Sequence, residues 1–281
     1  MSNGLNISLK SYDSIFQSEE QRNTEEIKPV PISELKPFTE QPFKVKLDED
    51  MDALVDSIKQ CGVLTPVIAR PHKDGGYEIL SGHRRVKACE LAGITDIPVV
   101  VKNLDDDTAT ILLVDSNLQR EHILPSEKAF AYQMKLEAMK RKAGRPSKEN
   151  PRQIVGNLES ADILGQDTGE SGRQIQRYIR LTNLIDPILD MVDNNQIAMN
   201  AAVEISYLSS KEQAAVMQSI EKEETSPSIA QARKMRKFHQ EGNLSNAVID
   251  SIMMEQKPET VKITLGEEKL KKYFPKSYSK A

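Results

Sequence analysis

Two adjacent arginines, Arg84 and Arg85, follow Gly82 and His83 where a predicted strand gives way to a predicted helix. A helix N-terminus exposes free N–H groups and a positive dipole, so cations there are unfavourable unless an anion joins them. The motif therefore indicates a phosphate site, in which His83 is a further candidate that could titrate near neutral pH. The alternative is that both arginines lie on the surface and reach acidic neighbours such as Asp105–Asp107.

A second polar group lies within residues 113–130. Asn117 offers an oxygen that can bind Mg²⁺ and an amide that can donate to a phosphate, and Arg120 could close over either ligand. The alternative is a helix-breaking connector in which Asn117 caps a turn and Arg120 pairs with Glu121. His122 is expected at an exposed turn. Together with the arginine motif upstream, the segment is distinctive.

Residues 161–185 have the pattern of a helix-turn-helix. Such a unit needs a small residue where the two helices touch, a glycine in the turn, and apolar anchors on the second helix. With Gly169 in the turn, Ser171 becomes the N-cap of the second helix. The residues that would pack the two helices together are Leu164, Gly165, Ile175 and Tyr178.

The opposite face of that second helix is polar and cationic. Its residues are Arg173, Gln174, Gln176, Arg177 and Arg180. Arginine and glutamine can each make two hydrogen bonds to a base edge in the DNA major groove, so this face predicts base reading. An ordinary helical hairpin with a solvated cationic face is the alternative.

A basic segment at 141–152 precedes the helix-turn-helix. It has five lysines or arginines against one acid, a net charge of +4. Lys142 and Arg145 are its candidates for contact with phosphate or the minor groove. A solvated linker is the alternative for this segment.

These residues need an α/β scaffold followed by a helical one. Residues 48–60 have apolar side chains at i, i+3, i+4 and i+7, an acidic first turn, and Gly62 as an αL stop. A helix is predicted at 81–93, and short strands are predicted at 66–70, 77–80 and 97–101. Beyond 107 strand signals nearly vanish; a clear helix is predicted at 126–142, and further helical segments follow to about 255. The chain is therefore predicted to be α+β, with a small α/β domain before an all-helical one.

Length and composition agree with a modular protein. The 281 residues suggest two domains and a small third part. With 38 basic and 42 acidic residues the net charge is −4, which excludes a basic coat over the whole surface but allows a basic face. The sequence has neither an apolar run near the roughly 18 residues of a membrane helix nor a signal-peptide pattern. Cys61 and Cys89 give no metal spacing and no disulfide framework.

Taken in order, these segments resemble the ParB/RepB family of partition proteins, the centromere-binding CTPases of plasmid and chromosome segregation. The resemblance covers roughly residues 27–240. It rests on DALVDSIKQCGVLTPVIAR, SGHRRVKACELAG, SNLQREHILPSEKAFAY, and the helix-turn-helix with the RLTNLIDPILDMV that follows it. It implies a ParB/sulfiredoxin-like α/β domain, then a helical DNA-binding domain, in a protein of plasmid or mobile-element type.

The resemblance also implies a CTP site with Mg²⁺. Its GVLTP segment corresponds to the motif that lines the cytosine, its GHRR segment to the phosphate motif, and Asn117 to the metal-side residue of a third motif. The implied nucleotide-binding residues are Gly62, Thr65, Gly82, His83, Arg84, Arg85, Ser116, Asn117 and Arg120. At positions 83 and 116 the family usually has glutamates associated with hydrolysis and Mg²⁺ coordination. The departures at His83 and Ser116 therefore imply CTP binding with slow hydrolysis, in which His83 or Asp115 could take part.

The family further implies a homodimer on a palindromic centromere-like site, a clamp that CTP closes and that slides on DNA, and a ParA-type ATPase partner. The expected parts are a disordered arm at 1–26 that meets the ATPase, a nucleotide-binding domain at 27–115, a DNA-binding domain at 116–240, and a C-terminal region at 241–281 that could dimerise. The helix-turn-helix falls at about 160–185. The protein is expected to be cytoplasmic and associated with a nucleoid or plasmid.

Other functions fit parts of the sequence. A transcriptional repressor or nucleoid-associated regulator of a plasmid or mobile element would use the same helix-turn-helix. A small-molecule kinase such as a free-serine kinase shares the N-terminal fold, but it needs neither the helix-turn-helix nor the basic segment. Sulfiredoxin resembles the N-terminal segment too, and it is excluded because its chemistry needs a cysteine where this chain has Gly82.

Overall fold

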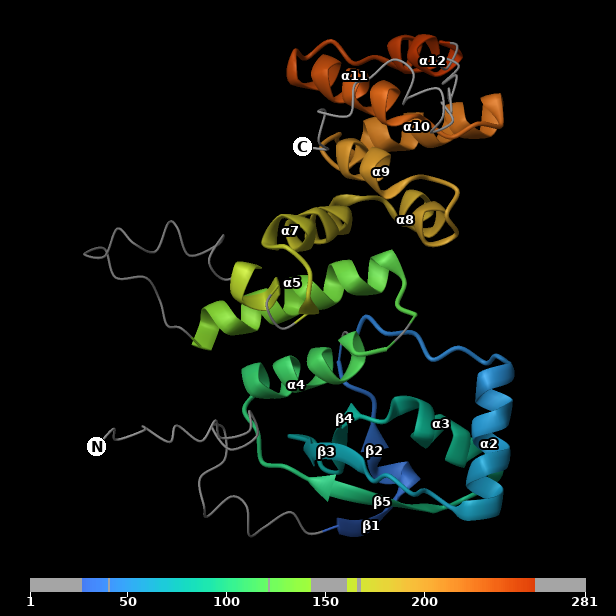
Figure 1. Cartoon of the computed structure of the whole chain (residues 1–281), viewed down its shortest axis with the longest axis vertical. Helices are drawn as coiled ribbons and strands as arrows, with labels where there is room; N and C mark the ends of the chain where they lie inside the picture. The colour runs from blue at the N-terminus through green and yellow to red at the C-terminus, as the bar shows by residue number, and fades with distance from the viewer. Residues whose placement is uncertain (1–26, 40, 121, 143–160, 166–167, 256–281) are drawn as a thin grey trace, which may run out of the picture.

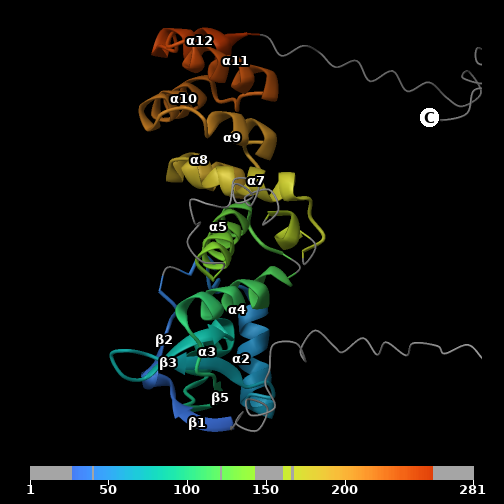
Figure 2. The same cartoon turned by 90° about the vertical axis from the view of Figure 1, so that its left-hand side faces the viewer.

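The computed structural model describes residues 27–39, 41–120, 122–142, 161–165 and 168–255. Within these residues the molecule is elongated, with a mixed sheet and its covering helices at one end and a stack of helices toward the other (Figure 1). Helices α4 (Asp106–Leu118) and α5 (Pro125–Lys142) lie between the two ends, as the turned view also shows (Figure 2). The predicted class, an α/β part followed by a helical part, is confirmed.

The sheet has five strands in the order β1-β5-β3-β4-β2. Their bounds are β1 Ile27–Pro31, β2 Leu35–Lys36, β3 Val67–Pro71, β4 Tyr77–Ser81 and β5 Asp96–Val101. β3 pairs with β5 in parallel and with β4 antiparallel, β1 pairs with β5 antiparallel, and β2 with β4 in parallel. The three central strands match the predicted ones. The edge strands are not predicted, because β2 is very short and two prolines weaken the strand pattern of β1, although proline is tolerated at a sheet edge.

Helices cover both faces of the sheet. α2 (Glu49–Cys61) and α3 (His83–Ala92) pack on one face, where Met51 and Val86 share a core with Ile79 of β4. On the other face, Leu113 of α4 shares a core with Leu80 of β4. Successive side chains of a strand point to opposite faces, so the neighbouring Ile79 and Leu80 serve the two layers.

The local sequence predicts the start of α2 but not its end, and it does not predict α4. Asp48 caps α2 as its acidic start predicts, and its Oδ1 accepts from the Met51 N–H at 3.0 Å. The prediction of an αL stop at Gly62 is wrong, since its φ of 69° comes with a ψ of −168°. α4 is not predicted as a helix, because it is buried both against the sheet and against α5 and so lacks a one-sided apolar stripe.

The helical end is built from short helices around one core. Residues 161–165 are helical. The elements that follow them are α7 Gly172–Arg180, η4 Leu181–Asn183, α8 Asp186–Asp193, α9 Met199–Ile205, α10 Ser210–Glu223, α11 Ile229–Gln240 and α12 Asn246–Met254. Their shared core joins Leu181, Ile188 and Val216 to Met235 and Ile252. The buried residues of α12 therefore pack with those of the preceding helices.

Two of the predicted domain boundaries fall within the described residues and can be compared with the structure. The boundary between 115 and 116 falls inside α4, and the boundary at 241 separates α12 from helices with which it shares a core. The arm at 1–26 and the segment 256–281 lie outside the described residues. In the part of the chain that the structure describes, no helix is long and apolar enough to cross a membrane.

Candidate nucleotide and DNA sites

The start of α3 depends on Gly82. Its φ is 105°, in the region that favours glycine, and a Cβ there would lie 3.0 Å from Val67 Cγ2 and 3.1 Å from Arg85 Nη2. The turn places His83 as the first helical residue, with Arg84 and Arg85 in the first turn, as predicted. Glycine at position 82 therefore lets the backbone at the start of α3 lie close to the Arg85 side chain.

The two arginines are held by different partners. Arg84 Nη2 lies 3.0 Å from Oδ1 of Asp48, the cap of α2. Arg85 Nη1 donates to the backbone oxygens of Thr65 and Pro66, the latter at 2.7 Å, and burial lowers the pKa of its guanidinium. The alternative in which these arginines reach Asp105–Asp107 is wrong. Those acids instead cap α4 and pair with Arg70, Lys73 and Arg141.

Arg85 also fixes the loop between α2 and β3. Thr65 and Gly62 are exposed on that loop, and the Thr65 carbonyl accepts from Arg85. A Cβ on Gly62 would meet nothing within 4 Å, and its positive φ is the feature that favours glycine. The predicted cytosine loop and the predicted phosphate motif are therefore joined by hydrogen bonds.

Asn117 lies in the last turn of α4 and is only 2% exposed, so the alternative of a turn-capping residue is wrong. Its Nδ2 donates to the Leu113 carbonyl at 2.8 Å, while its Oδ1 is buried without a hydrogen-bond partner. Ser116 Oγ donates to the same carbonyl at 2.9 Å. Arg120 follows the helix and stacks over the Phe43 ring at 5.7 Å.

His83 lies within the electrostatic field of Arg120. His83 is 6% exposed, and its Nε2 has no hydrogen-bond partner. Burial and then the charge of Arg120 lower the pKa of His83 to about 4, against an opposing effect of Glu78. The imidazole is therefore neutral at pH 7, and the expectation that it titrates near neutral pH is wrong. Burial also lowers the pKa of Arg120, and Arg84 adds to that effect.

Arg120 acts electrostatically on His83, and Arg84 acts on Arg120, so the start of α3 and the end of α4 form one cationic corner, with Arg85 next to Arg84 in the first turn of α3. Such a corner can hold a polyphosphate. Among the described residues no group of three or more His, Cys, Asp or Glu could hold a metal ion alone. A cation here would need the oxygens of the bound anion as well.

The predicted helix-turn-helix forms in the described residues 161–165 and 168–180. Gly169 has a φ of 72° in the turn, and Ser171 caps α7 by accepting from the Gln174 N–H. A Cβ on Gly165 would lie 2.2 Å from the Glu170 carbonyl oxygen, which explains the small residue at the helix contact. Ile175 is fully buried, whereas Tyr178 is partly buried between two cores.

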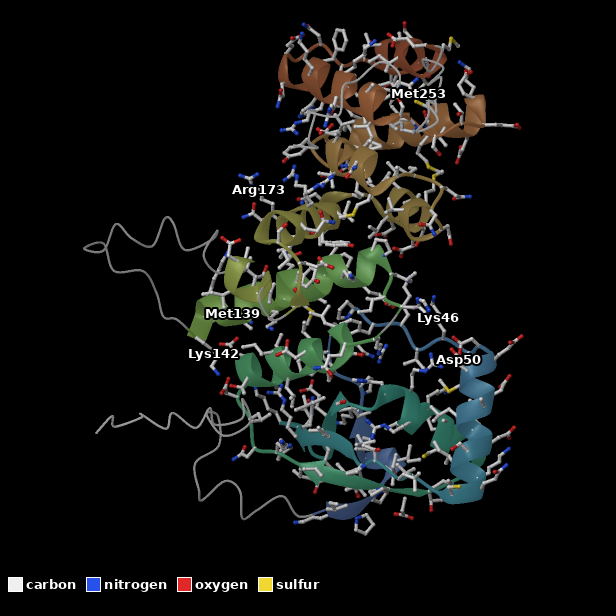
Figure 3. All side chains as sticks on the ribbon, in the orientation of Figure 1. Lys46, Asp50, Met139, Lys142, Arg173 and Met253 are labelled. Atoms are coloured by element: carbon white, nitrogen blue, oxygen red, sulfur yellow. The ribbon has the colours of Figure 1, made fainter. Side chains whose placement is uncertain are left out.

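The cationic face of α7 is not uniform. Arg173 and Gln176 are exposed, and Arg173 projects on the same side of the molecule as Lys142 (Figure 3). Arg177 donates to Asn200 of α9, and Gln174 lies against Met199. Arg180 differs, because it donates to the Ser206 carbonyl at 3.0 Å and stacks 3.9 Å over the Tyr207 ring. These contacts make Arg180 a link between α7 and α9.

Residues beyond the helix-turn-helix continue this face. A groove of about 500 Å³ lies between Arg173 and Arg177 of α7, Asn200 and Glu204 of α9, and Arg233 of α11. Arg233 Nε lies 3.3 Å from Glu204 Oε1, and its side chain is 70% exposed. Arg233 is not predicted from the sequence, although the cation-rich stretch ARKMRK within α11 is a signal that could indicate it.

The basic segment is described only at its start. Lys142, the last residue of α5, donates from Nζ to Thr108 Oγ1 at 2.7 Å, so it reaches back to the start of α4. Arg145 lies outside the described residues. The predicted phosphate contact of this pair stays a prediction.

Two family models match the chain, the ParB N-terminal domain over residues 16–118 and the ParB HTH domain over residues 158–253. Among curated proteins, a nucleoid occlusion protein of Geobacillus sp. (strain WCH70) is 30% identical over 194 residues, 69% of this chain and 62% of that protein. A probable chromosome-partitioning protein ParB of Neisseria meningitidis serogroup A is 32% identical over 174 residues, 62% of this chain and 54% of that protein. The chain therefore spans between half and two thirds of the length of these relatives.

A solved structure of C-terminally truncated ParB from Caulobacter crescentus, complexed to the centromeric parS site, is 22% identical with a TM-score of 0.43. It covers 82% of this chain and 100% of its own. The same protein complexed with CTP-gamma-S is 26% identical with a TM-score of 0.32, covering 69% and 98% of the two chains.

Proposed function

The chain belongs to the ParB family, and on that premise we propose that it is a partition protein that binds a centromere-like DNA site through α7. The observation that carries the proposal is the placement of Arg173, Gln176 and Arg177 on the side of α7 away from the buried Ile175. This is how a recognition helix enters the major groove. The symmetric, palindromic form of the site follows if the chain acts as a homodimer.

The DNA surface would extend beyond the recognition helix. Arg233 borders the same groove as Arg173 and Arg177, and its partner Glu204 also pairs with Arg236 at 2.8 Å. Phosphate oxygens would compete with Glu204 for Arg233, so this residue would position the protein rather than read bases. Lys142 and Arg145 would contribute phosphate or minor-groove contacts from the basic segment.

The same proposal includes CTP at the cationic corner. Arg84, Arg85 and Arg120 would supply charge for the triphosphate, and the loop at Gly62 and Thr65 would line the cytosine, as the family resemblance implies. The residues fit such a ligand, because two buried polar atoms, His83 Nε2 and Asn117 Oδ1, have no partner in the free protein. When bound, Mg²⁺ would neutralise phosphate charge, with Asn117 as its protein ligand.

Hydrolysis would be slow. Neither His83 nor Ser116 has a carboxylate that could orient water. His83 is also neutral and buried, and Ser116 already donates to the Leu113 carbonyl. Asp115, the nearest acid in sequence, pairs with Lys135 at 2.6 Å. CTP would then close the N-terminal parts of two copies into a clamp that opens mainly by nucleotide release. A ParA-type ATPase would be the partner, and the N-terminal arm its contact.

The proposal is tested with purified full-length chain and fragmented DNA of its host. Sequencing of the bound fragments should give one enriched palindrome, and calorimetry should give tighter binding for CTP than for ATP or GTP. Failure to enrich any sequence would contradict the DNA part, whereas equal affinity for the three nucleotides would contradict the cytosine site. Turnover of free serine with a nucleotide would instead indicate the kinase alternative.

A second function is favoured by one comparison, the similarity to a nucleoid occlusion protein. In that case the chain would be a nucleoid-associated regulator with the same DNA and nucleotide sites. The partition function predicts that loss of the gene raises the rate of plasmid or chromosome loss, whereas the regulator predicts normal segregation.

A further inference from the structure

A hollow of about 640 Å³ lies between α5 and α8, and none of the described residues that line it belongs to the nucleotide corner or to the groove at α7. Phe130 and Met134 of α5 and Leu189 of α8 give it apolar surface. Phe130 is 39% exposed, so an aromatic ring is open to solvent beside these neighbours. A concave lining with an accessible aromatic ring is typical of a binding site.

The same hollow is acidic. Glu137 of α5 and the α8 residues Asp186 and Asp190 line it and are exposed, against one cation, Lys44, among the described lining residues. Glu137 accepts from Gln133 Nε2 at 3.0 Å. Within the part of the chain that the structure describes, neither aspartate forms an ion pair. Carboxylates beside an aromatic ring favour a ligand that combines cationic and aromatic side chains.

The chain itself contains one segment of that composition. Of the two terminal stretches outside the described residues, 1–26 has two basic and five acidic residues, a net charge of −3, whereas 256–281 has seven lysines and three glutamates, a net charge of +4. Residues 269–281 read KLKKYFPKSYSKA, with five lysines, three aromatic residues and no acid. Charge complementarity therefore selects the C-terminal stretch rather than the N-terminal one.

This segment is long enough to reach the hollow from α12. α10 packs against both α8 and α12, so one helix separates the two. Packed helices lie about 8–10 Å apart, which places the axes of α8 and α12 about 20 Å from each other. The residues 256–268 could span about 40 Å if extended, which leaves length to pass around α8.

We propose that residues 269–281 bind in the hollow between α5 and α8 of the same copy. Their lysines would face Glu137, Asp186 and Asp190, and one of their aromatic rings would cover Phe130. The inference rests on neither the CTP site nor the DNA face. Salt should weaken the contact, because the carboxylates that hold the lysines are exposed.

The test is photo-cross-linking of the full-length chain without DNA, with benzoylphenylalanine in place of Phe274. Mass spectrometry should place the cross-links within 126–137 or 186–190. Asp190→Lys should lower their yield by about fivefold, because it turns an exposed attraction into a repulsion. Glu221→Lys is the matched control, since Glu221 is exposed on α10 and does not line the hollow. Its yield should equal that of the wild type.

A charge exchange separates a direct contact from a general effect of charge. Lys272→Glu alone should lower the yield, and Lys272→Glu combined with Asp190→Lys should restore part of it. Mixing isotopically light and heavy copies shows whether a cross-link forms within one copy. Cross-links between copies, cross-links to other elements or to DNA alone, or equal yields in Asp190→Lys and Glu221→Lys would each overturn the inference, whatever the outcome for the nucleotide and DNA sites.

Discussion

The nucleotide corner and the DNA face of this chain hold their charges in opposite ways. At the corner, Arg84 and Arg85 are already bonded to Asp48 and to loop carbonyls, and the groups left without partners are buried. On the DNA face, Arg173 and Gln176 are exposed. The arginines of the corner are therefore held by protein partners, whereas the DNA face combines exposed side chains with others, such as Arg177, that are held by a neighbouring helix.

The two proposed functions would be separated along the chain. The corner comes from the start of α3 and the end of α4, and the DNA face from α7, α9 and α11, beyond α5 (Figure 1). A change at one should leave the intrinsic affinity of the other intact.

Arg84→Ala should give the largest loss. It removes a partly buried charge at the proposed triphosphate and leaves Asp48 unpaired beside it, so CTP binding should weaken by about 2–5 kcal/mol. Binding of the target duplex without nucleotide should not change. Calorimetry with CTP measures the first effect, and Lys87→Ala, on the same helix with its partner Glu90, is the control. Unchanged CTP affinity in Arg84→Ala would refute the corner as the phosphate site.

Arg177→Ala should weaken binding at the specific DNA site by about 1–3 kcal/mol and relax its sequence preference. Fluorescence anisotropy with the target and a scrambled duplex measures both. CTP affinity should stay at the wild-type value. Lys234→Ala is the control, since Lys234 pairs with Glu255 on the same helical end of the molecule and does not line the α7 groove. If Arg177→Ala binds the target as the wild type does, α7 is not the recognition helix.

His83→Glu should raise CTP turnover if a missing acid limits hydrolysis. General acid–base catalysis contributes about 10²–10⁴-fold when fully positioned, so a gain of about tenfold is expected from a partly positioned carboxylate. Phosphate release with target DNA is the measurement, for the wild type, for His83→Glu, and for His83→Glu with Ser116→Glu. Fast turnover by the wild type would mean that His83 or another group already does this work.

Arg233→Ala should give the smallest effect. As a phosphate contact it should weaken binding to all sequences alike and reduce the salt slope of log K by about 1. Lys237→Ala on the same helix is the control, because Lys237 pairs with Glu241 rather than Glu204. A loss confined to the target sequence would show that Arg233 reads bases instead.

The DNA face could be predicted from sequence because its determinants are local. Gly165, Gly169, Ser171 and Ile175 lie within eleven positions, and each has the role that helix-turn-helix geometry demands of it. The exception is Arg180, whose stacking on Tyr207 depends on the turn that follows α9. The groove residue Arg233 was missed for the same reason.

The corner could be predicted only in part. Gly82 locates the helix start and hence the arginines, but their partners Asp48 and Thr65 come from other elements. The burial that lowers the pKa of His83 is likewise a result of tertiary packing. The helix that carries Asn117 is not predicted, because α4 is covered on two sides and shows no amphipathic pattern.

The central claim, a DNA-bound clamp controlled by CTP, is tested most directly by chromatin immunoprecipitation of the wild-type chain and of Arg84→Ala in the native host. The account predicts a wild-type signal that spreads over kilobases around one site, and an Arg84→Ala signal confined to that site. A wild-type signal that is itself confined to its binding site would contradict the account and indicate a simple DNA-binding regulator.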